Sequence, residues 1–206
     1  MGKRSIIVCA SINDLFRGVS LMTTKNPVKP LSGSVEMRSE GQLRMLPLGM
    51  PEAAVKQNIA LLNQITVDSL MLQDLYKKYH WQVAGPTFQL LHLLFDKHAE
   101  EIEHTIDLLA ERIQTLGGIV QAMPRNVVAK SKVEPAPSGE ETASAMLKRL
   151  LNAHALVIQE TREAIEITEQ NKDYGSNDLL MSDILRMHEL QCWFINQHLV
   201  EMQQAW

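Results

Sequence analysis

Six side chains that could bind a metal ion recur along one predicted helix of the 206-residue chain. They are His92, Asp96, Glu100, Glu103, Asp107 and Glu111. Successive members lie three or four residues apart, so all of them share one face of an α-helix. Almost no basic residue stands four positions away to neutralise them, so the face repels itself. Histidine combined with carboxylates is a ligand set suited to iron, manganese or zinc.

This acidic face has a plain alternative, since charged helix faces commonly just face water. If the face binds metal, one helix cannot complete the site, because Asp96 and Asp107 lie ~16 Å apart along the axis. Two copies packed antiparallel around a two-fold axis near residues 101–102 would place Asp96 opposite Asp107. The same axis would place His92 opposite Glu111. Metal binding therefore predicts an isologous dimer with two equivalent sites, each built from both chains.

Other metal and catalytic motifs are missing from the sequence. An intrasubunit di-iron site usually needs two Glu-x-x-His pairs on separate helices. Only Glu101 with His104 forms such a pair, and we expect both to be solvated. The sequence has no His-Glu-x-x-His motif, Gly-rich phosphate loop or nucleophile elbow. Its two cysteines, Cys9 and Cys192, cannot form a disulfide framework or a four-thiolate site.

Four long helices are expected to position these side chains, and no strand pattern competes with them. Apolar residues recur at helical spacing over residues 51–81, 86–116, 139–170 and 178–203. Pro51 suits the first turn of the first helix, and Gly117-Gly118 suits the end of the second. Ser138 followed by Glu141 resembles a capping box that opens the third helix.

A long connection separates the second predicted helix from the third. Residues 119–140 contain three prolines, and a short helical piece is predicted over residues 125–132. The fold class is therefore all-α: a four-helix bundle with a short helix in the connection between helices 2 and 3. Such a connection is typical of the ferritin-like crossover.

The first fifty residues differ from the rest of the chain and are predicted to be a variable, flexible tail preceding a bundle over residues 51–206. Residues 23–50 are rich in Thr, Lys, Pro, Ser and Gly and show no period. We expect a start-site ambiguity at Met22 rather than a targeting segment. The first fifty residues hold seven basic and three acidic residues, whereas the remainder is acidic. Such a tail is either a nucleic-acid arm or an ordinary solvated segment.

No apolar run in the sequence reaches the ~20 residues that a membrane span needs. This excludes an integral membrane protein and leaves the four-helix bundle with its acidic face as the feature that carries function.

The sequence from His80 to Phe88 resembles that of the Dps family, the ferritin-like mini-ferritins first named as DNA-binding proteins of starved cells. It reads His-Trp-Gln-Val-Ala-Gly-Pro-Thr-Phe. The likeness continues through Leu91-His92, Phe95-Asp96, Asp107 to Ile113, Leu116 to Gly118, Asp173 to Leu179, His188-Glu189 and Trp193. It covers residues 51–203 and fails only in the first fifty residues.

The resemblance implies a ferroxidase site shared across a dimer two-fold axis. One chain would supply His80, His92 and Asp96, and its partner would supply Asp107 and Glu111. The spacing alone gave four of these ligands, and the resemblance adds His80. The implied reaction is oxidation of Fe(II), preferably by hydrogen peroxide and otherwise by oxygen. Zinc or another divalent metal could occupy the same ligands.

The resemblance also implies a hollow dodecamer that stores ferric mineral and protects against oxidative stress, in the cytoplasm or on the nucleoid. Iron would enter through acid-lined three-fold pores. The motif match places Asp173 and Asp178 there, with Asp183 in the next turns, although turn chemistry alone also explains such residues. Trp81, beside His80, would either trap stray oxidising equivalents or be a core or interface tryptophan.

A DNA-binding nucleoid protein with incidental metal binding is the alternative function, and a shell that holds zinc or another metal is a third. From Met22 the tail carries four basic and two acidic residues, and the acidic body opposes DNA. We therefore expect DNA binding to be weak or absent at physiological salt. His154 lies on a core stripe and is expected to be packed. The pattern does not assign His98, His104, His154, His188 or His198 to further metal sites.

Overall fold

The computed structural model describes residues 36–200, and all regular elements in that range are helices. The long helices are α1 (Glu52–Gln82), α2 (Phe88–Thr115) and α4 (Ala143–Gln170). A fourth rod consists of α5 (Tyr174–Leu179), the π-helix η2 (Leu180–Leu185) and α6 (Arg186–Gln197). A short helix, α3 (Pro124–Lys130), lies in the long connection.

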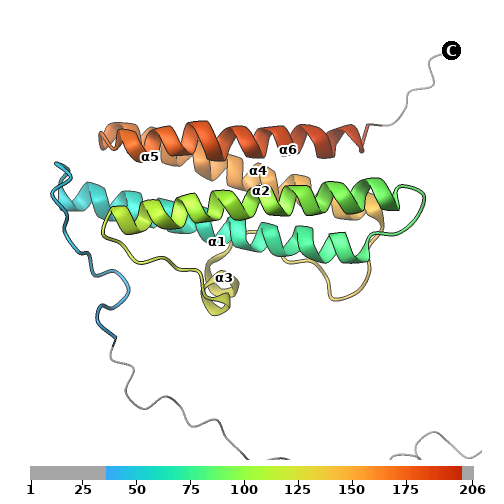
Figure 1. Cartoon of the computed structure of the whole chain (residues 1–206), viewed down its shortest axis with the longest axis horizontal. Coiled ribbons are helices and arrows are strands. Elements are labelled where there is room, and N and C mark those ends of the chain that lie inside the picture. Colours follow the sequence, from blue (N-terminus) through green and yellow to red (C-terminus); the bar gives the residue numbers. More distant parts are fainter. Residues whose placement is uncertain (1–35, 201–206) are drawn as a thin grey trace, which may run out of the picture. The chain divides into compact units, whose positions relative to one another are not determined.

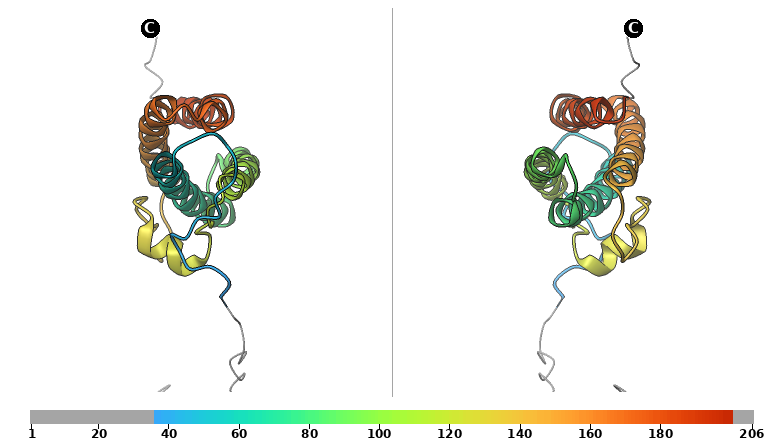
Figure 2. Two further views of the ribbon diagram at one scale, coloured as in Figure 1. Left: turned by 90° about the vertical axis from the view of Figure 1, so that its left-hand side faces the viewer. Right: turned by 90° about the vertical axis from the view of Figure 1, so that its right-hand side faces the viewer.

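The order and direction of the four rods confirm the predicted ferritin-like bundle. α1 and α2 form an antiparallel pair, and α2 and α4 run in the same direction, which requires the long crossover between them (Figure 1). Seen along the rods, the four pack around a common centre, and α3 lies outside them (Figure 2). No helix among residues 36–200 is long and apolar enough to cross a membrane.

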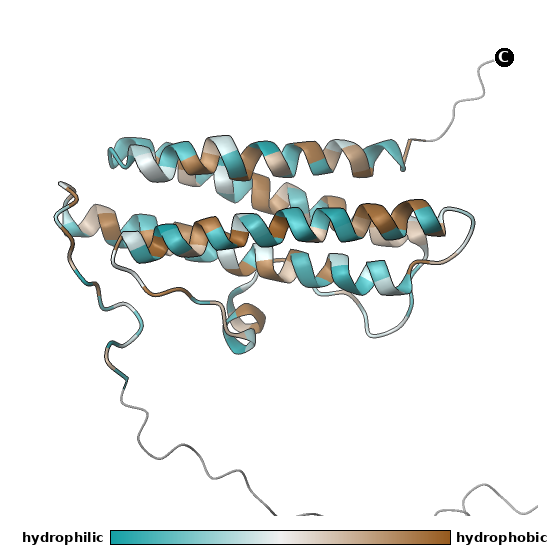
Figure 3. Ribbon diagram, in the orientation of Figure 1, coloured by the Kyte–Doolittle hydropathy of each residue, from teal (hydrophilic) through white to brown (hydrophobic). Residues whose placement is uncertain are grey.

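The apolar faces of the rods form one core. Leu62, Tyr76, Phe95, Ile102 and Leu150 are completely buried. Hydrophilic and hydrophobic residues alternate along the rods, as expected for helices with one buried face (Figure 3). Burying one such large side chain is worth ~1.5–3 kcal/mol, so the core holds both ligand-bearing helices, α1 and α2, in fixed register.

The end of α2 is held by a glycine and by the segment before the bundle. Gly117 has a φ of +84°, and a Cβ there would lie 2.0 Å from the carbonyl oxygen of Arg44. The carbonyl oxygen of Gly117 accepts hydrogen bonds from the Arg38 guanidinium and the Arg44 amide. Residues 38–50 form no helix or strand but are anchored here. Residues 1–35, with Met22, lie outside the described range, so the flexible tail stays a prediction for them.

The predicted start of the third helix is wrong. The α4 cap is Thr142, whose hydroxyl accepts a hydrogen bond from the amide of Ala145, and not Ser138. The Glu141 side chain instead accepts hydrogen bonds from the Tyr79 hydroxyl and the Arg149 guanidinium.

The bounds of the fourth helix also differ from the prediction. It begins at Tyr174 instead of residue 178, because Asp173 caps α5 there. Its helical part ends at Gln197 instead of residue 203, and residues 201–206 lie outside the described range. The π-helical turns over residues 180–185 change the phase of the side chains in mid-rod. A pattern with a fixed period cannot reveal that change.

Candidate metal-binding site

Two histidines on neighbouring helices are locked together by reciprocal hydrogen bonds. His80 lies near the end of α1, and His92 lies in the second turn of α2. Nδ1 of each ring is 2.8 Å from the backbone carbonyl oxygen of the other residue. The rings stack with centroids 3.8 Å apart. A carbonyl can only accept, so in the neutral ring Nδ1 carries the proton and Nε2 has the free lone pair.

This pairing fixes how both imidazoles are oriented, so each ring could bind a metal ion without moving. The backbone fixes the tautomer and the orientation of each ring, as outer hydrogen bonds do for metal-binding histidines in general. His80 is mostly shielded and His92 is half-buried. The donor set therefore fits a divalent first-row metal.

Asp96 lies one turn after His92 and completes the group that one chain brings together. Its Oδ1 accepts a hydrogen bond of 2.6 Å from Nζ of Lys77 on α1. The same oxygen lies 3.9 Å from Nδ1 of His80. The bond from Lys77 lowers the pKa of Asp96 below its usual value. Asp96 is therefore ionised, as a metal ligand must be, but its ammonium partner competes for the same oxygen.

Asp107 and Glu111 are exposed on the same face of α2 and stay apart from the other three residues within one chain. In residues 36–200 of a single chain, no three His, Cys, Asp or Glu side chains are placed to hold a metal ion. An open groove of 570 Å³ between α1 and α2 is lined in part by Glu100, Glu103 and Asp107. The shared five-residue site stays a prediction.

Trp81 does not belong to the core of the single chain, because 71% of it is exposed. Phe88, Leu90 and Leu93, at the start of α2, are also large, apolar and exposed. Grouped apolar side chains of this kind typically mark surfaces where proteins associate. Of the predicted roles for Trp81, those of an interface residue and a trap for oxidising equivalents both stay open.

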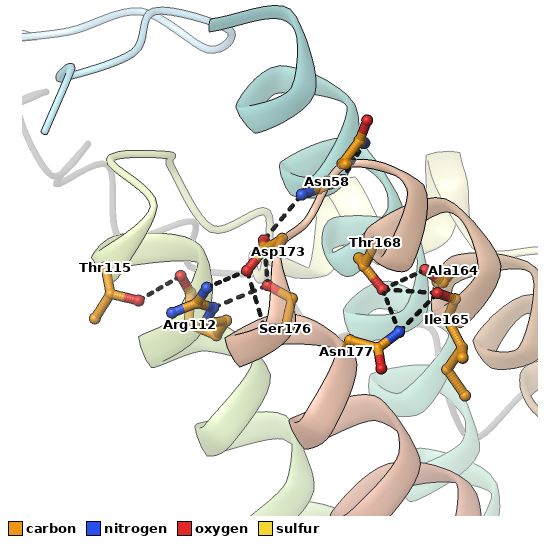
Figure 4. Close-up of polar contacts among 10 residues, drawn as sticks. Asn58, Arg112, Thr115, Ala164, Ile165, Thr168, Asp173, Ser176 and Asn177 are labelled. Atoms are coloured by element: carbon orange, nitrogen blue, oxygen red, sulfur yellow. Dashed lines mark hydrogen bonds and ion pairs between the residues drawn. The ribbon is translucent and has the colours of Figure 1, made fainter. Parts of the chain in front are cut away.

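Asp173 is buried, with 2% of its surface exposed, and makes polar contacts with Asn58, Arg112 and Ser176 (Figure 4). It accepts hydrogen bonds from Nδ2 of Asn58 at 2.9 Å and from the amide and hydroxyl of Ser176 at 3.1 and 2.7 Å. It also pairs with the Arg112 guanidinium. Burial alone would raise the pKa of Asp173, but these bonds outweigh it, and the pKa lies below its usual value.

Within one chain, Asp173 is therefore the cap of α5 and a tie from α5 to α1 and α2. Its carboxylate has no free face toward solvent. Asp178 and Asp183 are exposed on the same rod, and the assignment of all three acids to a pore stays a prediction.

A buried polar chain in the core is a feature that the sequence pattern did not reveal. The hydroxyl of Tyr76 lies 2.6 Å from Nε2 of His154 and 3.1 Å from Nδ1 of His98. Nδ1 of His154 lies 2.9 Å from Nδ1 of His188. The four residues come from α1, α2, α4 and α6, and all are completely buried. His154 is packed, as expected.

Burial keeps this chain neutral. It lowers the pKa of His98 to about 4 and that of His188 to about 3, and it lowers the pKa of His154 as well. Each of the four occupies a core position of its own helix. Only packing in three dimensions joins them, so no motif along the sequence could have identified the group.

The bundle with its single crossover, together with the histidines and the carboxylate gathered between α1 and α2, defines a ferritin-like protein. The family model described as "Ferritin-like domain" matches residues 59–205. A Bacillus anthracis relative named "DNA protection during starvation protein 2" is 31% identical over 146 residues, covering 69% of this chain and 99% of the relative. An uncharacterised Kitasatospora aureofaciens protein is 40% identical over 131 residues, covering 64% of this chain and 87% of the relative.

Solved structures give the same result. DpsC from Streptomyces coelicolor superposes with a TM-score of 0.81 at 41% identity, covering 84% of this chain and 100% of that one. Dps from Thermosynechococcus elongatus superposes with a TM-score of 0.70 at 31% identity, covering 74% and 96%. The chain belongs to the Dps family of ferritin-like proteins.

Proposed function

We propose that this protein oxidises Fe(II), preferably with hydrogen peroxide, and stores the ferric product as mineral inside a hollow dodecamer. Membership of the Dps family supports iron storage and protection in general terms. The finer proposal rests on one observation. The reciprocal pair of His80 and His92 presents two Nε2 lone pairs next to an ionised Asp96.

In the proposed site, the partner's Asp107 and the partner's Glu111 complete the ligand set. Neutral imidazoles suit Fe(II), and carboxylates stabilise the Fe(III) that forms, since they are hard anionic ligands. A pair of Fe(II) ions supplies both electrons that hydrogen peroxide needs to become water. Hydroxyl radical is then not released, which is how the reaction would protect the cell.

The exposed apolar residues near the site support the proposed assembly. Trp81, Leu90 and Leu93 lie beside the proposed ligands, where the partner subunit would cover them. Asp178 and Asp183 are the proposed pore acids, since exposed carboxylates in a row attract cations. We place the protein in the cytoplasm, where peroxide and Fe(II) can meet.

The proposal is tested by loading the full-length protein with Fe(II) without oxygen and then adding peroxide. Stopped-flow absorbance follows iron oxidation, and a spin trap reports hydroxyl radical. We expect fast oxidation at about two Fe(II) per peroxide, with little trapped radical. Asp96→Ala should slow the fast phase by about 100-fold, within the range that loss of a metal ligand or its support causes.

The matched control is Glu166→Ala, which removes an exposed carboxylate on α4. It should leave the fast phase unchanged. Slow oxidation at equal rates in all three proteins would contradict the proposed iron site. Protein-bound zinc, measured by elemental analysis, would then favour a metal-holding shell without turnover.

A further inference from the structure

The polar chain in the core runs from His98 to Tyr76, His154 and His188. Its Nε2 atoms at the two ends, on His98 and His188, have no hydrogen-bond partner among the described residues. A network buried in this way and left incomplete is less stable than a well-packed apolar core. The chain therefore carries a stability cost that packing alone does not explain.

The number of protons on the four residues determines which of them donates in each hydrogen bond. Each neutral member has one proton to donate. In the arrangement that fits the shortest bond, the Tyr76 hydroxyl donates to Nε2 of His154, at 2.6 Å. His154 then donates from Nδ1 to Nδ1 of His188, and His98 donates to the phenol oxygen. A phenol bonded to an imidazole can lose an electron readily, because its proton moves along the bond that it already makes.

Tyr76 also lies close to the proposed iron ligands. It precedes His80 by one turn of α1, a rise of ~6 Å. Its ring meets the Phe95 ring edge-on with centroids 5.9 Å apart, and Phe95 adjoins Asp96. The phenol therefore lies one helical turn from His80 and packs against the residue that precedes Asp96. It is nevertheless fully shielded from solvent, which would protect an oxidised form.

We propose that Tyr76 is a reserve electron donor for the oxidant at the iron site, with His154 as its proton acceptor. The inference rests on the proposed function. Hydrogen peroxide needs two electrons, and a site that holds a single Fe(II) supplies one. Tyr76 supplies the second electron, so hydroxyl radical is not released.

One Fe(II), the Tyr76 phenol, neutral His154, one hydrogen peroxide and two solvent protons give one Fe(III), the Tyr76 phenoxyl radical, protonated His154 and two waters. The O–O bond of peroxide and the O–H bond of Tyr76 break, and an N–H bond forms on His154. A later Fe(II) ion returns the electron, and His154 returns the proton.

Tyr79 is the neighbouring tyrosine and is a poorer donor. Its hydroxyl donates to Glu141, which pairs with the Arg149 guanidinium. The bonds from Tyr79 and Arg149 help keep the pKa of Glu141 below its usual value, although burial opposes them. Moving a proton onto Glu141 would break its ion pair with Arg149, whereas a proton placed on Nε2 of His154 breaks no ion pair.

The test uses the three tyrosines of the full chain, which are Tyr76, Tyr79 and Tyr174. A double variant, Tyr79→Phe with Tyr174→Phe, keeps Tyr76 alone and leaves the buried chain intact. Protein made with ring-deuterated tyrosine is loaded with fewer Fe(II) ions than the proposed sites hold, mixed with peroxide and frozen. Electron paramagnetic resonance detects the radical, and absorbance follows iron oxidation in the same mixture.

We expect a transient radical in the wild type and in the double variant, with a signal that narrows when tyrosine is deuterated. Tyr76→Phe should lose the signal and release several-fold more trapped hydroxyl radical. His154→Gln should lower the radical yield several-fold while iron oxidation persists. If Tyr76→Phe folds poorly, the double variant still tests the proposal, because Tyr76 is its single tyrosine.

Fast iron oxidation with no tyrosyl signal in the wild type would overturn the role of Tyr76 alone. A signal that deuteration leaves unchanged, or that disappears in the double variant, would do the same. Fe(II) that stays unoxidised in the wild type would overturn the proposed function and this inference with it.

Discussion

The ammonium of Lys77 binds the oxygen of Asp96 that a metal ion would need. The pair is half-exposed on both sides, so solvent screens it. Its effect on the site has two parts. It keeps Asp96 ionised, and it must leave before a cation can bind. At neutral pH Asp96 stays ionised without help, so competition is the larger effect.

Lys77→Met should therefore tighten the binding of a divalent cation. An exposed ion pair is worth ~0–1 kcal/mol, so the dissociation constant should fall by up to about five-fold. Titration calorimetry with Zn(II) measures this without oxidation chemistry. Lys78→Met is the matched control, because Lys78 bonds to Gln82 and to the carbonyl of Gly139 instead. Weaker Zn(II) binding in Lys77→Met alone would mean that Lys77 supports the site.

At the scale of the elements, Asp173 joins the start of α5 to α1 and α2. Asp173→Ala removes a helix cap and leaves the Arg112 guanidinium without its buried partner. The free energy of unfolding should fall by about 2–4 kcal/mol. Urea denaturation followed by circular dichroism measures the loss. Asp178→Ala, on the same rod but exposed, should change it by less than about 0.5 kcal/mol.

The same carboxylate predicts how stability depends on pH. Its pKa in the folded protein lies below the ordinary value of 3.8. Its stabilising contribution is therefore complete well above pH 3.8 and is lost as the pH falls through the folded pKa. Wild type and Asp173→Asn should converge in stability toward low pH. If the two free energies of unfolding differ by the same amount from neutral pH into the acid range, the charge of Asp173 contributes nothing to stability.

At the scale of the whole molecule, the shared site makes a prediction about mixed assemblies. Asp96→Ala and Asp107→Ala should each abolish fast oxidation alone. A mixed dimer contains one chain of each variant. One of its two sites then lacks both Asp96 and Asp107, and the other site has all its ligands. Random co-assembly makes half of the dimers mixed, so about a quarter of the wild-type activity should return.

Two differently tagged chains expressed together provide the sample, and stopped-flow absorbance provides the rate. The control is a mixture of Asp96→Ala with Glu111→Ala, which should recover similarly. A site confined to one chain would give no recovery in either mixture, since every chain would lack a ligand.

DNA binding also belongs to the whole assembly, because many weak tails add by avidity. The tail is basic and the rest of the chain is acidic. We expect any shift of DNA in a gel at low salt to disappear by ~150 mM salt. A complex that persists there would favour the nucleoid function. The wild type and a variant lacking residues 1–35 should then be compared.

The sequence by itself determined the four-helix bundle, because apolar residues at helical spacing can be buried only by packing those helices together. It also determined the face that carries His92, Asp96, Asp107 and Glu111, since helix geometry converts spacing directly into a shared face. His80 needed the family resemblance, because a histidine at a helix end has no periodic signal of its own.

Only the tertiary structure decided how the side chains are used. The carbonyl bonds that set the tautomers of His80 and His92 join two helices, and so does the bond from Lys77 to Asp96. The burial of Asp173 and the polar chain around Tyr76 also depend on contacts between residues far apart in the sequence. Periodicity reports which face of a helix is buried. Which atom meets which inside the core depends on how the helices pack, and that is fixed only when they fold together.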